Sequence, residues 1–121
     1  MKGIIFKSEL KVLEVLWREG DTTAKDLAIQ LNSSTAWSKT TSYTVIKKCI
    51  DKGFIERLGT NFMCRAKITR EEAQKHETEL LIDKMFGGSS ELLIALLLGG
   101  SQLSASQVEQ LRNMVKAFAS E

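Results

Sequence analysis

Residues 39–48 carry many hydroxyl and lysine side chains. Hydroxyl groups can exchange hydrogen bonds with the edges of nucleic-acid bases, and lysines pair with phosphates. Apolar residues at positions 45, 46, 49 and 50 predict a helix whose opposite face carries these polar groups. A solvated helix face has the same composition, so the neighbouring sequence has to decide between the two interpretations. The candidate DNA-binding residues of this helix are Lys39, Thr40, Thr41, Tyr43, Thr44, Lys47 and Lys48.

Two arginines in the following segment are further candidates for phosphate contact. Apolar runs at residues 54–58 and 62–66 flank the turn residues 59–61, which is the pattern of a tight β-hairpin. Arg57 and Arg65 lie in these runs and could contact a phosphate backbone from the hairpin. The alternative is a solvated edge strand, where basic residues discourage aggregation.

The sequence offers little for metal binding or catalysis. His76, with Glu72 and Glu79 at helical spacing, is the only histidine, and a single histidine among glutamates is a weak metal signal. Cys49 and Cys64 lie at apolar positions without CxxC spacing, and we expect both to be reduced core residues. No phosphate-binding glycine loop and no nucleophile elbow occurs. We therefore predict no metal, no cofactor and no enzymatic activity, since a carboxylate-based hydrolase would lack any supporting motif.

Periodicity and capping residues predict six helices, three on each side of the hairpin. Ser8, Thr23 and Ser38 are the expected N-caps of the first three helices, and Thr69 and Ser104 those of two later ones. The second helix is expected to span about two turns, before a polar turn over residues 32–36. The expected helices begin at residues 8, 23, 38, 69, 90 and 104 and end near residues 19, 31, 52, 86, 98 and 118.

This order of elements predicts a mainly α (α+β) fold. Helix, helix, turn, helix and a basic hairpin form the layout of a winged helix-turn-helix, in which the third helix enters the DNA major groove. We expect a winged-helix DNA-binding domain over residues 1–68 and a C-terminal helical dimerisation region over residues 69–121. Residues 1–67 carry a net charge of +5 and residues 68–121 a net charge of −3, as expected if only the first part meets a polyanion.

The segment Leu92–Leu98 would be apolar on every face of a helix. Such a helix needs cover on all sides, and two neighbouring helices supply too little of it, so a second copy of the chain is the expected cover. The alternative is that this helix packs back on the first domain. The candidate dimerisation residues are Leu81, Met85, Leu92, Leu93, Leu96, Leu97, Val108, Leu111, Val115 and Phe118.

Bulk composition is that of a folded globular protein, with 43% apolar and 26% charged residues. The longest apolar run is too short to span a bilayer, and no signal-peptide pattern occurs at the start. We expect a cytoplasmic protein with no membrane partner.

Several motifs together resemble one family. Trp37-Ser38, followed by Thr41, Thr44, Val45, Lys48 and Lys52-Gly53, resembles the recognition-helix signature of the penicillinase and methicillin-resistance repressors. Residues 9–17 resemble the first helix of that family, and residues 86–89, 92–98 and 103–112 resemble its dimerisation region. The resemblance covers nearly the whole chain. It implies a dimeric winged-helix repressor that binds an operator.

Three departures from the family concern operator choice and regulation. Ser42 stands where the family usually has an aliphatic residue, and Tyr43 occupies a variable DNA-facing position. In the β-lactam branch an Asn-Phe bond is cleaved on induction, and the corresponding bond here is Leu96-Leu97. The copper-responsive branch has a cysteine-rich tail, whereas no cysteine follows Leu103 here.

We therefore predict a sequence-specific transcriptional repressor that binds a pseudo-palindromic double-stranded DNA operator as a homodimer. Repression would end through loss of the dimer, with a regulatory protease as a possible further partner. The alternative is a winged-helix module for protein contacts without specific DNA binding, which the salt dependence of DNA affinity would distinguish.

Overall fold

We analysed a computed structural model of the 121-residue chain, which describes residues 3–99 and 104–119. Within the last helix, the side chains of residues 111, 114, 115, 118 and 119 lie outside this description. The chain divides into two compact units, Met1–Ala73 and Gln74–Glu121.

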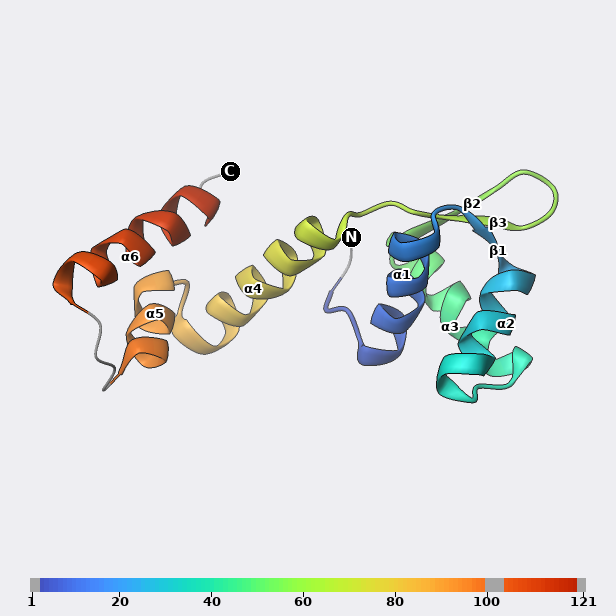
Figure 1. The fold of residues 1–121 in the computed structure, drawn as a ribbon, viewed down its shortest axis with the longest axis horizontal. Coiled ribbons are helices and arrows are strands. Elements are labelled where there is room, and N and C mark those ends of the chain that lie inside the picture. The colour runs from blue at the N-terminus through green and yellow to red at the C-terminus, as the bar shows by residue number, and fades with distance from the viewer. Residues whose placement is uncertain (1–2, 100–103, 120–121) are drawn as a thin grey trace. The chain divides into compact units, whose positions relative to one another are not determined.

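Unit 1 contains three helices and a small antiparallel sheet (Figure 1). The strand order in the sheet is β1-β3-β2, and Arg57 on β2 pairs with Cys64 on β3. The elements are α1 (Lys7–Glu19), β1 (Thr22–Thr23), α2 (Ala24–Thr35), α3 (Lys39–Asp51), β2 (Ile55–Leu58), β3 (Met63–Ala66) and the first turn of α4 (Arg70–Phe86). The predicted hairpin and third helix are confirmed. β1 was not predicted, because two residues are too short to show an alternating pattern.

Three of the predicted N-caps in unit 1 are confirmed by hydrogen bonds. Thr23 Oγ1 accepts from the Asp26 backbone N–H at 3.2 Å, and Ser38 Oγ accepts from the Thr41 N–H at 3.1 Å. At the start of α4, Thr69 and Glu72 exchange two hydrogen bonds of 3.0 Å each, as in a capping box. These caps satisfy backbone N–H groups that the first helical turn leaves without partners.

Two predicted helix ends in unit 1 are wrong. Ser8 is not the cap of α1. The Glu9 carboxylate turns back and accepts from the Phe6 backbone N–H at 2.8 Å, so Phe6 is the N-cap and the helix begins at Lys7, two residues earlier than a Ser8 cap would give. The second helix continues to Thr35 instead of ending at residue 31. It ends at Ala36, which adopts a left-handed conformation (φ 64°) and donates to the Asn32 carbonyl at 2.9 Å.

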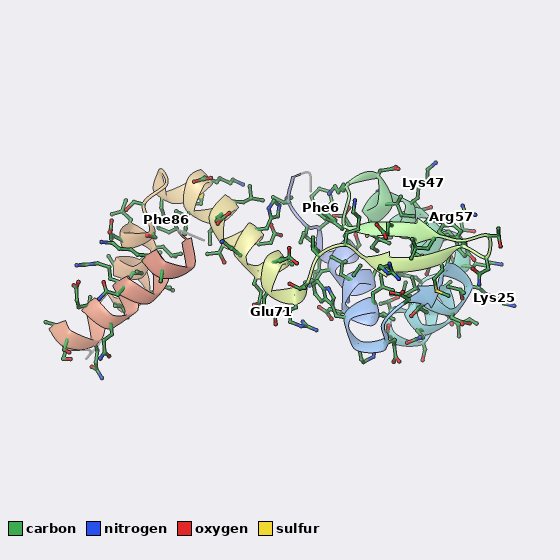
Figure 2. All side chains as sticks on the ribbon, turned by 90° about the horizontal axis from the view of Figure 1, so that it is seen from above. Phe6, Lys25, Lys47, Arg57, Glu71 and Phe86 are labelled. Atoms are coloured by element: carbon green, nitrogen blue, oxygen red, sulfur yellow. The ribbon has the colours of Figure 1, made fainter. Side chains whose placement is uncertain are left out.

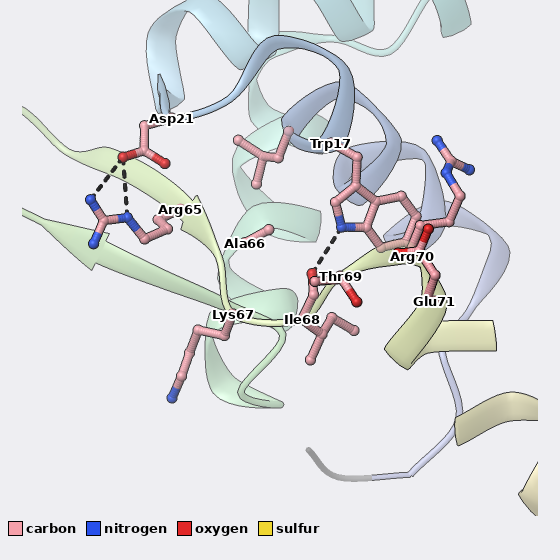
Figure 3. A pocket seen from close by; sticks show the side chains of 10 residues that line it. Trp17, Asp21, Arg65, Ala66, Lys67, Ile68, Thr69, Arg70 and Glu71 are labelled. Carbon is pink, nitrogen blue, oxygen red and sulfur yellow. Dashed lines mark hydrogen bonds and ion pairs between the residues drawn. The ribbon is translucent and has the colours of Figure 1, made fainter. Parts of the chain in front are cut away.

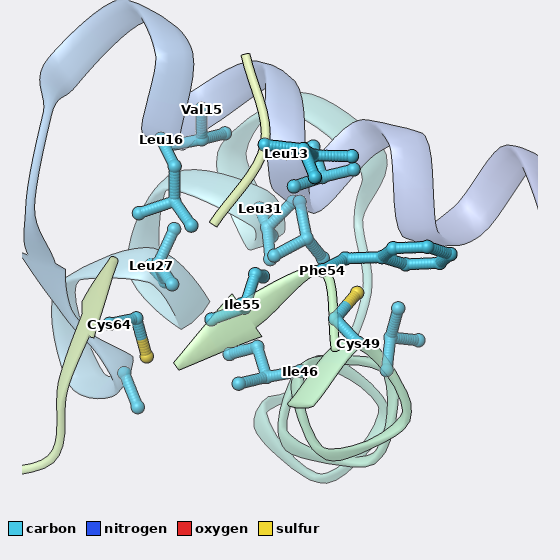
Figure 4. Close-up of a cluster of buried hydrophobic side chains, with 14 of the residues drawn as sticks. Leu13, Val15, Leu16, Leu27, Leu31, Ile46, Cys49, Phe54, Ile55 and Cys64 are labelled. Atoms are coloured by element: carbon cyan, nitrogen blue, oxygen red, sulfur yellow. The ribbon is translucent and has the colours of Figure 1, made fainter. Parts of the chain in front are cut away.

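The core of unit 1 lies where the three helices meet the hairpin (Figure 4). Leu13 from α1, Leu27 from α2 and Ile46 from α3 are fully buried, together with Phe54 ahead of β2. Cys49 and Cys64 are fully buried free thiols, which confirms their prediction as core residues. Each secondary structure element of unit 1 therefore has its apolar side covered within the unit, as a stable small domain requires.

Unit 2 contains the rest of α4 together with α5 (Ser90–Leu98) and α6 (Ala105–Ala119). Ser104 and Gln107 form the predicted capping box of α6, with hydrogen bonds of 3.1 and 2.9 Å. α5 packs against α6, and Ile94 is its buried residue. None of the helices in the described part of the chain combines the length and apolar character that crossing a membrane requires.

One ion pair of unit 1 joins a fully buried carboxylate to a half-buried lysine. Glu9 is fully inaccessible, and its Oε1 lies 2.9 Å from the Lys52 ammonium. Lys52 also donates to the Ile4 carbonyl at 3.0 Å and lies 3.9 Å from the centre of the Phe6 ring. The pair therefore ties the residue that follows α3 to the beginning of α1.

We expect Lys52→Met to lower the free energy of unfolding of unit 1 by about 3 kcal/mol, because it leaves the Glu9 carboxylate buried without its cation. Combining it with Glu9→Gln should restore part of the loss. Urea unfolding followed by tryptophan fluorescence measures this, since Trp17 and Trp37 both lie in unit 1. Arg18→Met, which breaks the exposed pair with Glu19, is the control and should cost less than about 0.5 kcal/mol. If Lys52→Met and Arg18→Met lowered the free energy of unfolding by the same amount, the importance assigned to the pair of Lys52 with Glu9 would be contradicted.

Candidate nucleic-acid interface

The polar side chains of α3 lie on its exposed face, as predicted. Ser42, Val45, Ile46 and Cys49 form the buried face. Since i, i+4 and i+7 positions share one side of a helix, Thr40, Thr44 and Lys47 form the central line of the opposite face. All three are exposed, and Lys47 projects outward from unit 1 (Figure 2). Exposed Thr41 and Lys48 lie on one flank of this line, and exposed Lys39 lies on the other flank beside half-buried Tyr43.

The hydroxyl groups of α3 make short-range hydrogen bonds within the helix. Ser38 Oγ lies 3.1 Å from Thr41 Oγ1, and Thr44 Oγ1 donates to the Thr40 carbonyl at 3.0 Å. Because a hydroxyl has one hydrogen and two lone pairs, Thr44 still presents acceptor capacity on the exposed face.

A shallow hollow lies on the surface of α3, over its first two turns. It is lined by Lys39, Thr40, Tyr43, Thr44 and Lys47, all of which the sequence predicted for DNA contact. A second hollow, which shares Lys39, is lined by Lys25, Ala28, Ile29 and Asn32 of α2. Lys25 and Asn32 were not predicted, because nothing in the sequence of α2 distinguishes them from other solvated residues.

The two hairpin arginines lie on opposite faces of the sheet. Residues paired across an antiparallel ladder share a face, and neighbours along a strand alternate. Arg57 pairs with buried Cys64, whereas Arg65 pairs with Glu56. Arg57 therefore lies on the face that carries the core residue, with its guanidinium 4.0 Å from the centre of the Phe62 ring.

Arg65 is bound by carboxylates of unit 1 (Figure 3). Its Nε and Nη2 donate to Asp21 Oδ2 at 3.1 and 3.0 Å, and its Nη1 lies 3.9 Å from Glu56 Oε1. The hydrogen bond and the charge of Asp21 raise the pKa of Arg65. Arg65 therefore fixes β3 to the loop after α1, and the structure does not bring it together with the basic residues of α3.

Tyr43 differs from the other predicted α3 contacts because its ring is half-buried. The ring meets Phe62 edge-on, with centroids 6.0 Å apart and an interplanar angle of 81°. The Lys39 ammonium lies 5.7 Å from the Tyr43 ring centre. Tyr43 thus contacts the residue that precedes β3.

The base of the hairpin is anchored to α1 by a tryptophan. Trp17 Nε1 donates to the Ile68 carbonyl at 2.9 Å, and the Arg70 guanidinium lies 4.8 Å from the Trp17 ring centre (Figure 3). These groups line a hollow that extends from Leu16 to Glu71. Two of its cations are already engaged, since Arg65 binds Asp21 and Arg70 lies over Trp17.

Unit 2 leaves an apolar surface exposed. The exposed fraction rises from 45% for Leu81 to 72% for Leu97, while Leu93 and Val108 are half-buried. The exposed predicted dimerisation residues are Leu81, Met85, Leu92, Leu96 and Leu97. The side chains of Leu111, Val115 and Phe118, also predicted for dimerisation, lie outside the described residues.

The remaining candidate chemistry finds no support in the described residues. No group of three or more His, Cys, Asp or Glu side chains is placed to hold a metal ion there, so His76 is not part of such a cluster. Burial, with a smaller effect of the Glu9 charge, raises the pKa of the Cys49 thiol to about 12. Burial likewise raises the pKa of Cys64 to about 11.

A three-helix unit whose third helix is followed by a β-hairpin defines a winged helix-turn-helix protein, which confirms the predicted fold class. The family model described as penicillinase repressor matches residues 5–117, and the chain belongs to this family. It is a family of transcriptional repressors and not of enzymes, as the sequence predicted.

Several known proteins are similar to the chain. The methicillin resistance regulatory protein MecI of Staphylococcus aureus is 24% identical over 113 residues, covering 92% of each chain. The penicillinase repressor of Bacillus licheniformis is 20% identical over 114 residues, covering 93% of this chain and 89% of the relative. A solution structure of the monomeric form of Bacillus licheniformis BlaI in complex with the blaP half-operator aligns with a TM-score of 0.50 and 26% identity. It covers 60% of this chain and 93% of the BlaI chain.

We expect both thiols to resist a thiol-specific colorimetric reagent at pH 8 in the native protein and to react once urea unfolds it, because each pKa lies well above its ordinary value of 9.0. A raised pKa means that the unfolded state ionises first. Stability is therefore unaffected by the thiols below about pH 9 and falls as the pH rises toward 11–12. Rapid modification of the native protein would contradict this assignment.

Proposed function

We propose that this protein is a sequence-specific DNA-binding transcriptional repressor that acts as a homodimer on a pseudo-palindromic operator. The observation that carries the proposal is the exposed face of α3, where threonines and lysines surround Thr44 in a chain of the penicillinase repressor family. Residues 1–68 form the DNA-binding part, and residues 69–121 form the dimerisation region. The similarity to BlaI, solved in complex with a half-operator, supports the same use of unit 1.

Base reading is assigned to the hydroxyl groups of α3. Thr44 accepts hydrogen bonds from base amino groups, because its hydroxyl hydrogen is directed to the Thr40 carbonyl. Thr40 and Thr41 contact the DNA beside it, where the first turn of a recognition helix lies deepest in the major groove. Exposed Asp51 continues the central line at the other end of α3, and its negative charge keeps that end away from phosphates.

Phosphate binding is assigned to four cations around this face: Lys39, Lys47, Lys48 and Arg57. Among the described residues, neither Lys47 nor Lys48 lies within ion-pair distance of a carboxylate. Arg57 is the cation of the wing. Arg65 supports the wing from the other side through Asp21.

We expect Lys47→Ala and Arg57→Ala to weaken binding to all DNA and to reduce the slope of log affinity against log salt by about one unit each. Arg65→Ala is the matched control on the same hairpin and should leave the slope unchanged. Thr44→Val should cost about 1–3 kcal/mol on the preferred site only. Fluorescence anisotropy across a salt series, with a site selected from random DNA and with random DNA itself, measures all four.

Two outcomes would contradict these assignments. A drop in slope for Arg65→Ala as large as for Arg57→Ala would reverse the roles of the two arginines. Equal affinity of the native protein for selected and random DNA would contradict a sequence-specific repressor and favour a protein-interaction module.

A second copy of the chain covers the apolar surface of unit 2. An exposed surface that includes Leu92, Leu96 and Leu97 is costly in water, and α5 has one buried residue to pack against α6. Members of a symmetric pair bury the same surface on both partners, and a palindromic site has the matching two-fold symmetry.

Repression ends when the dimer separates. The linkers that flank α5 are rich in glycine, and both Gly87 (φ 58°) and Gly88 (φ 85°) adopt left-handed conformations. A regulatory protease that cuts beside α5 would disconnect α6 and uncover the dimer surface, while the groups of α3 that read DNA stay unchanged.

We expect Leu97→Asp to give a folded monomer at micromolar concentration, because Leu97 is 72% exposed within its own chain. Its operator affinity should fall by roughly two to four orders of magnitude, with the same sequence preference, because each half-site is then bound independently. Sedimentation and anisotropy measure the two effects. Ile29→Asp, which alters an exposed apolar residue of unit 1, is the control for assembly state. A monomeric native protein, or a dimeric Leu97→Asp variant, would contradict the dimer.

A further inference from the structure

Four side chains connect α3 to the hairpin in one continuous series. The Lys39 ammonium lies 5.7 Å from the Tyr43 ring, the Tyr43 ring meets the Phe62 ring edge-on at 6.0 Å, and the Arg57 guanidinium lies 4.0 Å from the Phe62 ring. The series begins and ends with a cation, and its two central members are aromatic rings. We call Lys39, Tyr43, Phe62 and Arg57 the ladder.

Each contact of the ladder is of an attractive type. The faces of aromatic rings carry partial negative charge, so they attract ammonium and guanidinium groups, while an edge-on ring pair brings a positive edge to a negative face. The rings are half-buried against the core of unit 1. Lys39 and Arg57 are exposed, so their charges remain accessible to a partner.

The backbone at Phe62 fixes the hairpin end of the ladder. Phe62 adopts a left-handed conformation (φ 53°), which is unfavourable for a residue with a bulky side chain. Its carbonyl accepts from the Ala24 N–H at 2.9 Å, next to β1. The ring and carbonyl contacts stabilise a conformation that the turn alone would disfavour.

We propose that Tyr43 and Phe62 are positioning residues, whose edge-on rings hold Lys39 and Arg57 at a fixed separation so that α3 and the wing meet the DNA backbone together. This inference rests on the proposed DNA binding and alters one part of the sequence-based prediction. Tyr43, expected at the base-reading surface, acts through its ring contact with Phe62 and not through its hydroxyl. A flexible hairpin would instead have to order Arg57 on each encounter, at an entropic cost.

The test is a double-mutant cycle on the 121-residue chain, with anisotropy on selected and random DNA. Tyr43→Phe keeps the ring and should bind within about twofold of the native protein. Tyr43→Ala should weaken binding to both DNAs by a similar factor, about three- to tenfold. In an Arg57→Ala background, the same Tyr43→Ala change should have a clearly smaller effect, because Lys39 is then the one remaining ladder cation that the Tyr43 ring positions.

A second measurement does not require DNA. The Phe62 ring should shift the proton resonances of the Arg57 side chain upfield in NMR spectra, and Phe62→Leu should abolish this shift while urea unfolding verifies that the variant folds. If the shift is present and the native protein fails to bind DNA, the proposed function is wrong and the ladder stands.

Three results would overturn the ladder. One is an Arg57 resonance unaffected by Phe62→Leu. Another is that the effects of Tyr43→Ala and Arg57→Ala on the free energy of DNA binding are additive. The third is a loss for Tyr43→Phe as large as for Tyr43→Ala and confined to the selected site, which would make the Tyr43 hydroxyl a base-reading group.

Discussion

The ion pair between Glu9 and Lys52 holds the end of α3 against the beginning of α1. A fully buried carboxylate needs its cation, and Lys52 directly follows α3 and precedes Gly53 (φ 81°), where the chain turns toward β2. The same carboxylate accepts the first hydrogen bond of α1, from Phe6. The same carboxylate therefore holds the first turn of α1 and, through Lys52, the residue that lies between α3 and the strand that carries Arg57.

Local signals in the sequence were sufficient for most of the fold. Ser38 and Thr69 as caps, the glycine-containing turn of the hairpin and the apolar positions of α3 each involve residues within one or two turns of each other, so the pattern can be read directly from the chain. Glu9 was missed as a capping group because the N-cap, Phe6, has no side-chain oxygen to mark the start of the helix, and the ion pair of Glu9 was missed because Lys52 lies 43 residues away. The early end predicted for α2 has a different cause, since the polar residues 32–35 favour turns and remain helical through bonds to Ala36 and Leu31.

In the candidate site, too, the features that depend on neighbouring residues were predicted, and those that depend on residues distant in the sequence were not. The sequence placed Thr44 and Lys47 on the exposed face of α3, because helical periodicity alone decides that. It could not separate Arg57 from Arg65, since the difference comes from Asp21, which lies 44 residues from Arg65, and from the register that pairs Arg65 with Glu56. Nor could it separate Tyr43 from its polar neighbours, because the contact with Phe62 exists only in the folded unit. Ser42, which departs from the family pattern, is nevertheless buried, like the aliphatic residues expected there.

A basic residue indicates a phosphate contact only when its charge is not already used by the protein. Among the Lys and Arg side chains of residues 1–67, Lys52 and Arg65 are bound by carboxylates of unit 1, so the number of basic residues overstates the cations that a polyanion would meet, while the net charge of +5 stays the same. The two units also differ in the kind of side chain that they expose to solvent. Unit 1 buries its main apolar core and presents cations on α3, whereas unit 2 exposes Leu92, Leu96 and Leu97. In the proposed function, affinity for DNA changes when a second copy is gained or lost at unit 2, because that surface shares no residue with α3 or the wing. In the proposed repressor, sequence preference and occupancy of the operator are therefore controlled by separate parts of the same chain.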